Sequence, residues 1–170
     1  MKTTLALAFV AAGLVLGNAA RAETKGSLNS TDEKFVKEAA MHGKAEVRIS
    51  QLGIGKADDK AVKEIAEQMV KDHTMLNTEL ETLAKSKGVD LSVAGDPKAD
   101  KAIANLEKES GKDFDKAFLK ELQKGHKDTI SAFESESKDG KDSEIKAWVD
   151  KSLPTIRGHL DHIKGTMKGK

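Results

Sequence analysis

Residues 62–83, VKEIAEQMVKDHTMLNTELETL, contain the clearest structural pattern in the chain. Their apolar residues recur at spacings of three and four, which places them along one face of an α-helix. An aspartate at Asp58 or Asp59 can cap this helix where it begins, and Gly88 can end it. The segment therefore predicts a long amphipathic helix with one buried stripe, formed by Val62, Ile65, Ala66, Met69, His73, Leu76, Leu80 and Leu83.

Three further long segments show helical periodicity, and no segment after residue 22 alternates with the period of two that is typical of strands. Ser30 and Glu33 form a capping box, a pattern that begins many helices. Gly53 and Gly55 follow the apolar residues of that first helix, so we expect it to end near Leu52. The sequence thus predicts an all-α four-helix bundle, whose other long helices cover residues 30–52, 113–137 and 142–164.

The connection between the second and third long helices decides how the bundle is connected. About 25 residues extend from Gly88 to Lys112, and residues 98–110 within them have the pattern of a short helix. A connection of that length can cross from one end of a bundle to the other, as it does in ferritin-like folds. We therefore expect a ferritin-like bundle with a long helix 2 to helix 3 connection. An up-down bundle with a decorated loop is the alternative.

The N-terminal segment has the features of a cleaved secretory signal peptide. Lys2 is basic, residues 5–16 are apolar, and Ala20-Arg21-Ala22 has the small-x-small form of a cleavage site. The apolar run is shorter than the roughly 20 residues that span a bilayer. We therefore expect a soluble periplasmic protein without a transmembrane span. Its parts are a signal peptide at 1–22, a flexible leader at 23–30 and a four-helix-bundle domain at 31–168.

Charge and cysteine content narrow the classes of partner. The 29 basic and 28 acidic residues become 27 and 28 once Lys2 and Arg21 leave with the signal peptide. This balance argues against nucleic-acid binding, which needs a basic surface. The chain has no cysteine, so it can carry neither a disulfide nor a lipid-modified cysteine. Any association with the outer membrane would be peripheral, and the sequence leaves the oligomeric state open.

Histidines on the apolar faces of the predicted helices are the main candidates for a functional site. His42 and Glu46 lie on the stripe of the first helix, and His73 lies at the centre of the stripe of the second. His126 and His159 lie on the apolar faces of the third and fourth helices. Each of these residues is near the middle of its helix, so all four helices direct a polar side chain to one level of the core.

Several buried polar groups at one level need partners, because an isolated buried carboxylate is strongly unfavourable. A hydrogen-bonded Glu–His network or a bound cation can meet that need. Nitrogen-rich ligation without thiolate suits zinc, iron or copper better than calcium or magnesium. The predicted metal ligands are Glu46, His73, His126 and His159, with His42 as a further candidate. His162 lies at the edge of the apolar face of the fourth helix, and the sequence leaves open whether it takes part in the metal site.

Catalytic patterns are weak in this sequence. A di-iron oxidase centre uses Glu-x-x-His motifs, and none of the core histidines has a glutamate three residues before it. Asp72 can orient a histidine of a neighbouring helix. We predict a periplasmic metal-binding protein, for storage or stress protection, more readily than an enzyme. The alternatives are a non-catalytic envelope protein, structural or interacting, with a buried Glu–His network, and a metal-dependent oxidase or hydrolase.

The sequence resembles a bacterial family catalogued as a domain of unknown function, number 4142, and labelled predicted outer membrane protein. The resemblance covers about Asp32 to Ile163. The motifs that carry it are Ala45-Glu46-Val47, Met69-Val70-Lys71-Asp72-His73 with Asn77 and Leu80, Phe114-Asp115, His126, and Leu153-Pro154 followed by His159-Leu160.

The resemblance implies a ferritin-like fold and a secreted location. It singles out Glu46, His73, His126 and His159, while Asp72 and Asn77 are candidates to support these ligands from behind. His42 matches no family motif. Family members tend to carry a tyrosine after the Phe-Asp pair, where this chain has Phe118 and no tyrosine at all, so a redox role for that tyrosine does not carry over.

Overall fold

The computed structural model describes residues 28–92 and 95–169. Those residues form no strand, which confirms the all-α class. The predicted signal peptide at 1–22 and most of the predicted leader lie outside the described residues, so both stay predictions. The helices are α1 (Ser30–Lys56), α2 (Lys60–Ser86), α3 (Pro97–Leu106), α4 (Gly111–Asp139) and α5 (Ser143–Lys168).

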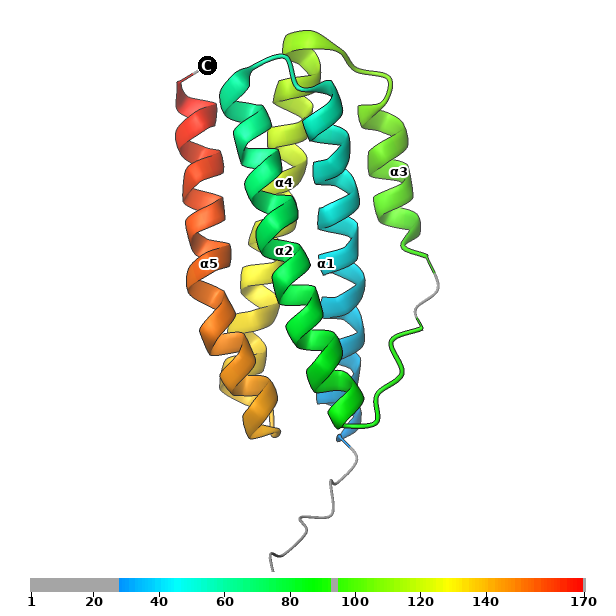
Figure 1. The fold of residues 1–170 in the computed structure, drawn as a ribbon. Helices are drawn as coiled ribbons and strands as arrows, with labels where there is room; N and C mark the ends of the chain where they lie inside the picture. Colours follow the sequence, from blue (N-terminus) through cyan, green and yellow to red (C-terminus); the bar gives the residue numbers. More distant parts are fainter. Residues whose placement is uncertain (1–27, 93–94, 170) are drawn as a thin grey trace, which may run out of the picture.

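The four long helices form a bundle of two hairpins, α1 with α2 and α4 with α5 (Figure 1). Helix α1 also packs on α4, and α2 packs on α5. After α2 the chain returns along the outside of α1, through α3, to the end of the bundle where α2 began (Figure 1). Because of this crossover, α2 and α4 run in the same direction, which is the ferritin-like connection and excludes the up-down alternative.

The ends of α1 differ from those predicted from the sequence. The residue that caps its start is Asn29, one residue before Ser30, and its side chain accepts hydrogen bonds from the backbone N–H groups of Thr31 and Asp32 at 2.9 and 3.1 Å. At the other end, α1 continues through Gly53 instead of ending before it. A Cβ atom at Gly53 would lie 2.4 Å from Cζ of Phe118, so this glycine lets α4 approach closely.

The starts of the other helices follow ordinary capping chemistry. Asp59 caps α2, as the sequence predicts, and Asp96 caps α3 immediately before Pro97. Asp142 caps α5 through hydrogen bonds from the N–H groups of Glu144 and Ile145. Helices α4 and α5 extend a few residues beyond their predicted bounds, while α3 ends earlier, at Leu106.

Two buried aspartates join the hairpins at opposite ends of the bundle. The Asp32 carboxylate, in the first turn of α1, accepts hydrogen bonds from the N–H groups of Lys141 and Asp142 in the α4–α5 turn. The Asp115 carboxylate of α4 accepts hydrogen bonds from the N–H groups of Asp58 and Asp59 in the α1–α2 turn. A buried aspartate of each hairpin therefore binds the backbone of the turn in the other hairpin.

The core consists of two apolar clusters with a polar layer between them. One contains Val36, Leu80, Phe133, Trp148 and Ile156 among its members. The other contains residues further along α1 and α5 and earlier in α2 and α4, including Ile49, Met69, Phe118, Leu122 and Ile163. Along every long helix, the predicted ligand residue falls between the two clusters. The fold therefore places those residues at one level.

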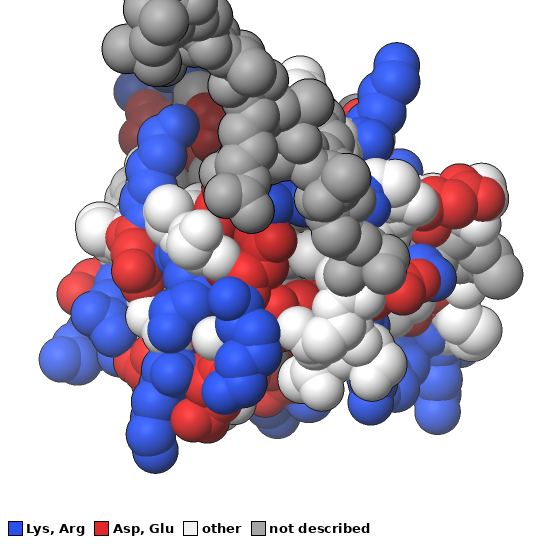
Figure 2. All heavy atoms as spheres, turned by 90° about the horizontal axis from the view of Figure 1, so that it is seen from below, with Lys and Arg blue, Asp and Glu red and all other residues white. Residues whose placement is uncertain are grey.

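The surface mixes both signs of charge. Seen along the bundle from below, basic and acidic side chains of the described residues lie next to one another (Figure 2). Many pair across one helical turn, such as Lys37 with Glu33 at 2.6 Å. Among the described residues, no helix has the length and apolar character needed to cross a membrane.

Candidate metal centre

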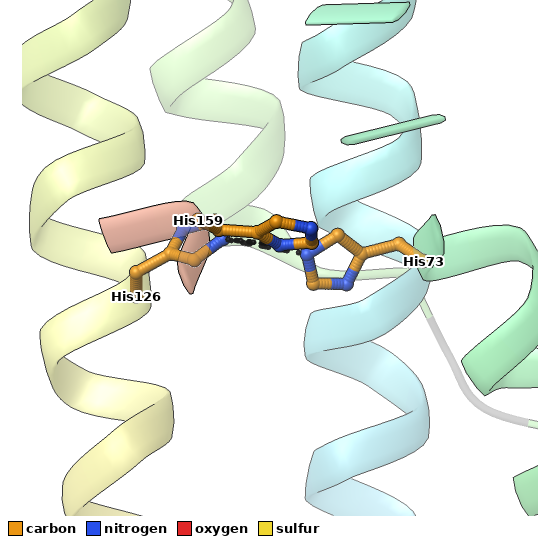
Figure 3. A group of neighbouring side chains, drawn as sticks. All are labelled: His73, His126 and His159. Carbon is orange, nitrogen blue, oxygen red and sulfur yellow. Dashed lines mark hydrogen bonds between the residues drawn. The ribbon is translucent and has the colours of Figure 1, made fainter. Parts of the chain in front are cut away.

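Three histidines from three helices meet in the polar layer. His73 comes from α2, His126 from α4 and His159 from α5, and their rings point toward one another (Figure 3). They are 4%, 1% and 1% exposed, so all three are withdrawn from solvent. Each offers one ring nitrogen, and these nitrogens all lie within 4.8 Å of one another.

The two distances from His126 to the other ring nitrogens suit shared ligation better than direct hydrogen bonding. Nε2 of His126 lies 3.5 Å from Nε2 of His73 and 3.4 Å from Nδ1 of His159. Hydrogen bonds to nitrogen donors are usually 2.7–3.2 Å long. Imidazole nitrogens at 2.0–2.1 Å from one metal ion lie about 3.3–3.6 Å apart in tetrahedral or trigonal geometry. Both distances fall within that range.

The remaining ring nitrogens fix the protons of two of the histidines. Nδ1 of His126 lies 2.9 Å from the backbone oxygen of Leu122, which can only accept, so Nδ1 carries the proton. Nε2 of His159 lies 2.9 Å from Oδ2 of Asp72 and donates to that carboxylate. In neutral rings, Nε2 of His126 and Nδ1 of His159 are then both unprotonated and face each other. Two lone pairs cannot hydrogen-bond, whereas a cation between them would bind both.

The surroundings keep two of the rings neutral. Burial lowers the pKa of His73 to about 3, with smaller contributions from the neighbouring His126 and His159. Burial also lowers the pKa of His126 to about 4. Metal ions bind the neutral imidazole, so these two histidines are in the ligating form at neutral pH.

Glu46 lies beside this cluster. Its Oε1 is 3.8 Å from Nδ1 of His126, the ring nitrogen that donates to Leu122 and does not face the other histidines. Oε2 of Glu46 is buried without a hydrogen-bond partner. Burial, with a smaller contribution from Glu121, raises the pKa of Glu46 to about 8. The three histidine nitrogens converge without Glu46, whose role as a direct ligand stays a prediction.

The other predicted residues surround the cluster at different distances. Asp72 contacts His159 from the neighbouring helix, in the arrangement expected of a carboxylate that orients a ligand. Asn77 packs against α1, where a Cβ at Gly43 would meet its side-chain oxygen. The prediction that His42 lies on the buried stripe is wrong, because His42 is exposed on α1. His162 is exposed on α5, with its Nδ1 3.1 Å from Oε1 of Gln68.

Two features of the site have only weak signals in the sequence. The backbone oxygen of Leu122 sets the tautomer of His126, and a backbone oxygen one turn earlier is present in every helix. Gly125 leaves space for the Glu46 carboxyl group, because a Cβ at position 125 would lie 2.3 Å from Oε1 of Glu46. A glycine inside a helix immediately before a core histidine is only a weak signal, because Gly158 precedes His159 in the same way and a Cβ there would meet nothing within 4 Å.

A family comparison identifies the group to which this sequence is related. The model of the family described as "Domain of unknown function (DUF4142)" matches residues 17–166. The chain belongs to this family. The match confirms the resemblance drawn from the motifs. None of the curated proteins matches this DUF4142 chain.

Solved structures share the fold of this DUF4142 protein at low sequence identity. A DUF305 fragment from Deinococcus radiodurans superposes with a TM-score of 0.76 at 12% identity, over 85% of this chain and 100% of that one. CopM in its Cu(II)-bound form gives a TM-score of 0.69 at 13% identity, over 81% of this chain and 96% of CopM. CopM in its Cu(I)-bound form gives a TM-score of 0.69 at 15% identity, over 83% of this chain and 98% of CopM. At these identities, the likeness establishes the fold.

Proposed function

We propose that this protein binds one transition-metal ion through His73, His126 and His159 and serves in periplasmic metal storage or stress protection. The observation that carries the proposal is the close approach of Nε2 of His126 and Nδ1 of His159, which face each other 3.4 Å apart while the other nitrogen of each ring contacts an acceptor. The Leu122 carbonyl and the Asp72 carboxylate hold the protons of both rings on the opposite nitrogens. This is how proteins orient metal-binding histidines.

Copper is the metal that we favour, followed by zinc. Three imidazole ligands suit both metals, and affinity for divalent ions of the first transition row is highest for Cu(II). The structural likeness to CopM, which is described as binding Cu(II) and Cu(I), supports the same choice. The periplasmic location rests on the N-terminal sequence, with its basic residue, apolar run and Ala-x-Ala site.

A structural network is the second candidate, and the Asp72 contact favours it. If His159 carried protons on both nitrogens, it could pair with Asp72 and donate to His126 across 3.4 Å. The contact between His126 and His159 would then be satisfied without a metal. The two candidates differ in one measurable property, because only the first requires a stoichiometric ion.

The test is a metal titration of untagged mature protein that has been stripped with a chelator. We expect elemental analysis after loading to give one copper or zinc per chain, and calorimetry to give a single site. His126→Gln should weaken binding at least 100-fold, because it removes the central ligand. His162→Gln changes an exposed histidine of α5 and should leave binding unchanged. Absence of a stoichiometric metal, or equal effects of the two substitutions, would reject the proposal in favour of the network.

A further inference from the structure

A cavity of about 180 Å³ lies beside the histidine cluster and is lined by all four long helices. His73 and Glu46 form part of its wall, and the exposed residues Glu38, His42 and Asp128 line it where it reaches the surface. An engineered cavity of roughly 150 Å³ in another protein accommodates benzene. This cavity therefore has room for a molecule with one ring, far more than a single metal ion needs.

Three aromatic rings form a continuous part of the cavity wall. The ring centroids of Phe35 and Phe133 are 5.5 Å apart, and those of Phe133 and Trp148 are 5.3 Å apart. All three side chains line the cavity, together with apolar residues of α1, α2 and α5. Such walls bind apolar groups, and aromatic faces also attract organic cations.

The charged groups that line the cavity are acidic. Its lining includes the carboxyl groups of Glu38, Glu46 and Asp128, and no lysine or arginine. Glu38 and Asp128 are exposed and pair with Lys34 and Lys124 on their own helices, neither of which lines the cavity. Glu46 is different because it is buried, and its Oε2 has no hydrogen-bond partner. A buried carboxyl oxygen without a partner is costly, so a cationic group from a ligand would relieve that cost.

We propose that this cavity binds a small organic amine, with its ammonium group at Glu46 and its apolar body against Phe35, Phe133 and Trp148. As the amine binds, Glu46 ionises and releases its proton to solvent, and the ammonium donates hydrogen bonds to Oε2 of Glu46. The body covers the aromatic faces, which also attract the positive charge. A metal ion alone would have no use for this apolar wall. The inference does not rest on metal binding, because Glu46 and the aromatic rings are in place without an ion.

The experiment compares three probes that share one ring and differ in head group. Benzylamine, benzyl alcohol and benzoate are titrated into metal-free protein and followed by NMR shifts of the indole N–H of Trp148, the only tryptophan. We expect benzylamine to bind at least tenfold more tightly than benzyl alcohol, and benzoate to bind most weakly. Equal or tighter binding of benzyl alcohol, or no binding by any probe, would overturn the proposal.

A pair of substitutions tests the contact with Glu46. Glu46→Gln keeps the shape of the side chain and should weaken benzylamine binding about tenfold, while benzyl alcohol binding stays within twofold. Glu67→Gln makes the same chemical change at an exposed position of α2 and should change neither affinity. Unchanged benzylamine affinity in Glu46→Gln would contradict the proposal. Because the protein is metal-free, failure here would leave the result of the metal titration standing.

Discussion

Glu46 is a carboxyl group that the fold withdraws from water, and its pKa of about 8 follows chiefly from that burial. Its ordinary pKa is 4.5, so the folded protein holds the Glu46 proton more tightly than the unfolded chain does. A carboxyl group whose pKa is higher in the folded protein than in the unfolded chain makes its full contribution to stability at pH values below the unfolded pKa. That stabilisation is lost as the pH rises toward the folded value, which here means between about 5 and 8.

Glu46→Gln should therefore make metal-free protein less sensitive to alkaline pH. The substitution removes the ionisation, so its stability relative to wild type should grow as pH rises from 5 to 8, by at most on the order of 4 kcal/mol. His73 and His126, with pKa values of about 3 and 4, stay neutral in the folded protein across this range, so the difference isolates Glu46. Urea unfolding at several pH values measures it, with Glu67→Gln as the control. A difference that stays constant across this range would show that Glu46 is not buried as described.

Asp72 should affect metal affinity without being a ligand. Its carboxylate accepts the Nε2 proton of His159, which leaves Nδ1 free for a metal. Asp72→Asn keeps a hydrogen-bond acceptor but loses the charge that makes the ring a better ligand, so we expect a 10–100-fold weaker affinity with unchanged stoichiometry. Calorimetric titration with Cu(II) and Zn(II) measures this. Asp150→Asn, an exposed aspartate of α5, provides the control, and equal losses in both variants would argue against the orienting role.

At the residue scale, helical periodicity predicted that His73, His126 and His159 face the core at one level, but it was wrong for His42, which is exposed. His73, His126 and His159 meet because each lies midway along its helix, and midpoints stay level whichever way a helix runs. The same reasoning could not place the Glu46 carboxyl group. Its position next to Nδ1 of His126 depends on a rotamer and on the space left by Gly125, which a helical wheel does not contain.

At the scale of the helix, two glycines should respond to the same substitution in opposite directions. Alanine is normally about 0.5–1 kcal/mol more favourable than glycine inside a helix. A Cβ at Gly158 of α5 would meet nothing within 4 Å, so Gly158→Ala should raise stability by that amount. A Cβ at Gly53 would lie 2.4 Å from Phe118 and 3.0 Å from Ala66, so Gly53→Ala should lower stability by about 1–3 kcal/mol. Chemical denaturation measures both, and stabilisation by Gly53→Ala would contradict the close packing of α1 on α4.

The sequence predicted that the first helix ends before Gly53, and this was wrong. Gly53 lies inside α1 and allows α4 to approach closely, which is what the Gly53→Ala substitution tests. A glycine can end a helix, or it can allow another element to approach, and one sequence does not distinguish these uses. The apolar periodicity before Gly53 predicted the helix itself correctly, because burial of one face decides whether a helix forms. Helix ends depend instead on single contacts, such as the hydrogen bonds that Asn29 accepts at the start of α1.

At the scale of the whole molecule, the histidine cluster and the buried aspartates connect the two hairpins in different ways. His73 belongs to the α1–α2 hairpin, whereas His126 and His159 belong to the α4–α5 hairpin. Asp32 and Asp115 join the hairpins at the two ends through hydrogen bonds to backbone N–H groups. The aspartates and the His159–Asp72 hydrogen bond join the hairpins whether or not an ion is present, while a bound metal would add a crosslink among the three histidines.

A metal ion should therefore stabilise the entire bundle against unfolding. At a free metal concentration 100 times the dissociation constant, binding adds about 2.7 kcal/mol, which raises Tm by roughly 5–11 °C for a domain of this size. His126→Gln should abolish that rise. Asp32→Ala should lower the metal-free Tm, because it leaves the N–H groups of Lys141 and Asp142 without their carboxylate acceptor, yet it should keep the metal-induced rise. Differential scanning calorimetry with and without copper measures all three proteins. If the rise disappeared in Asp32→Ala but survived in His126→Gln, the metal would bind outside the histidine cluster.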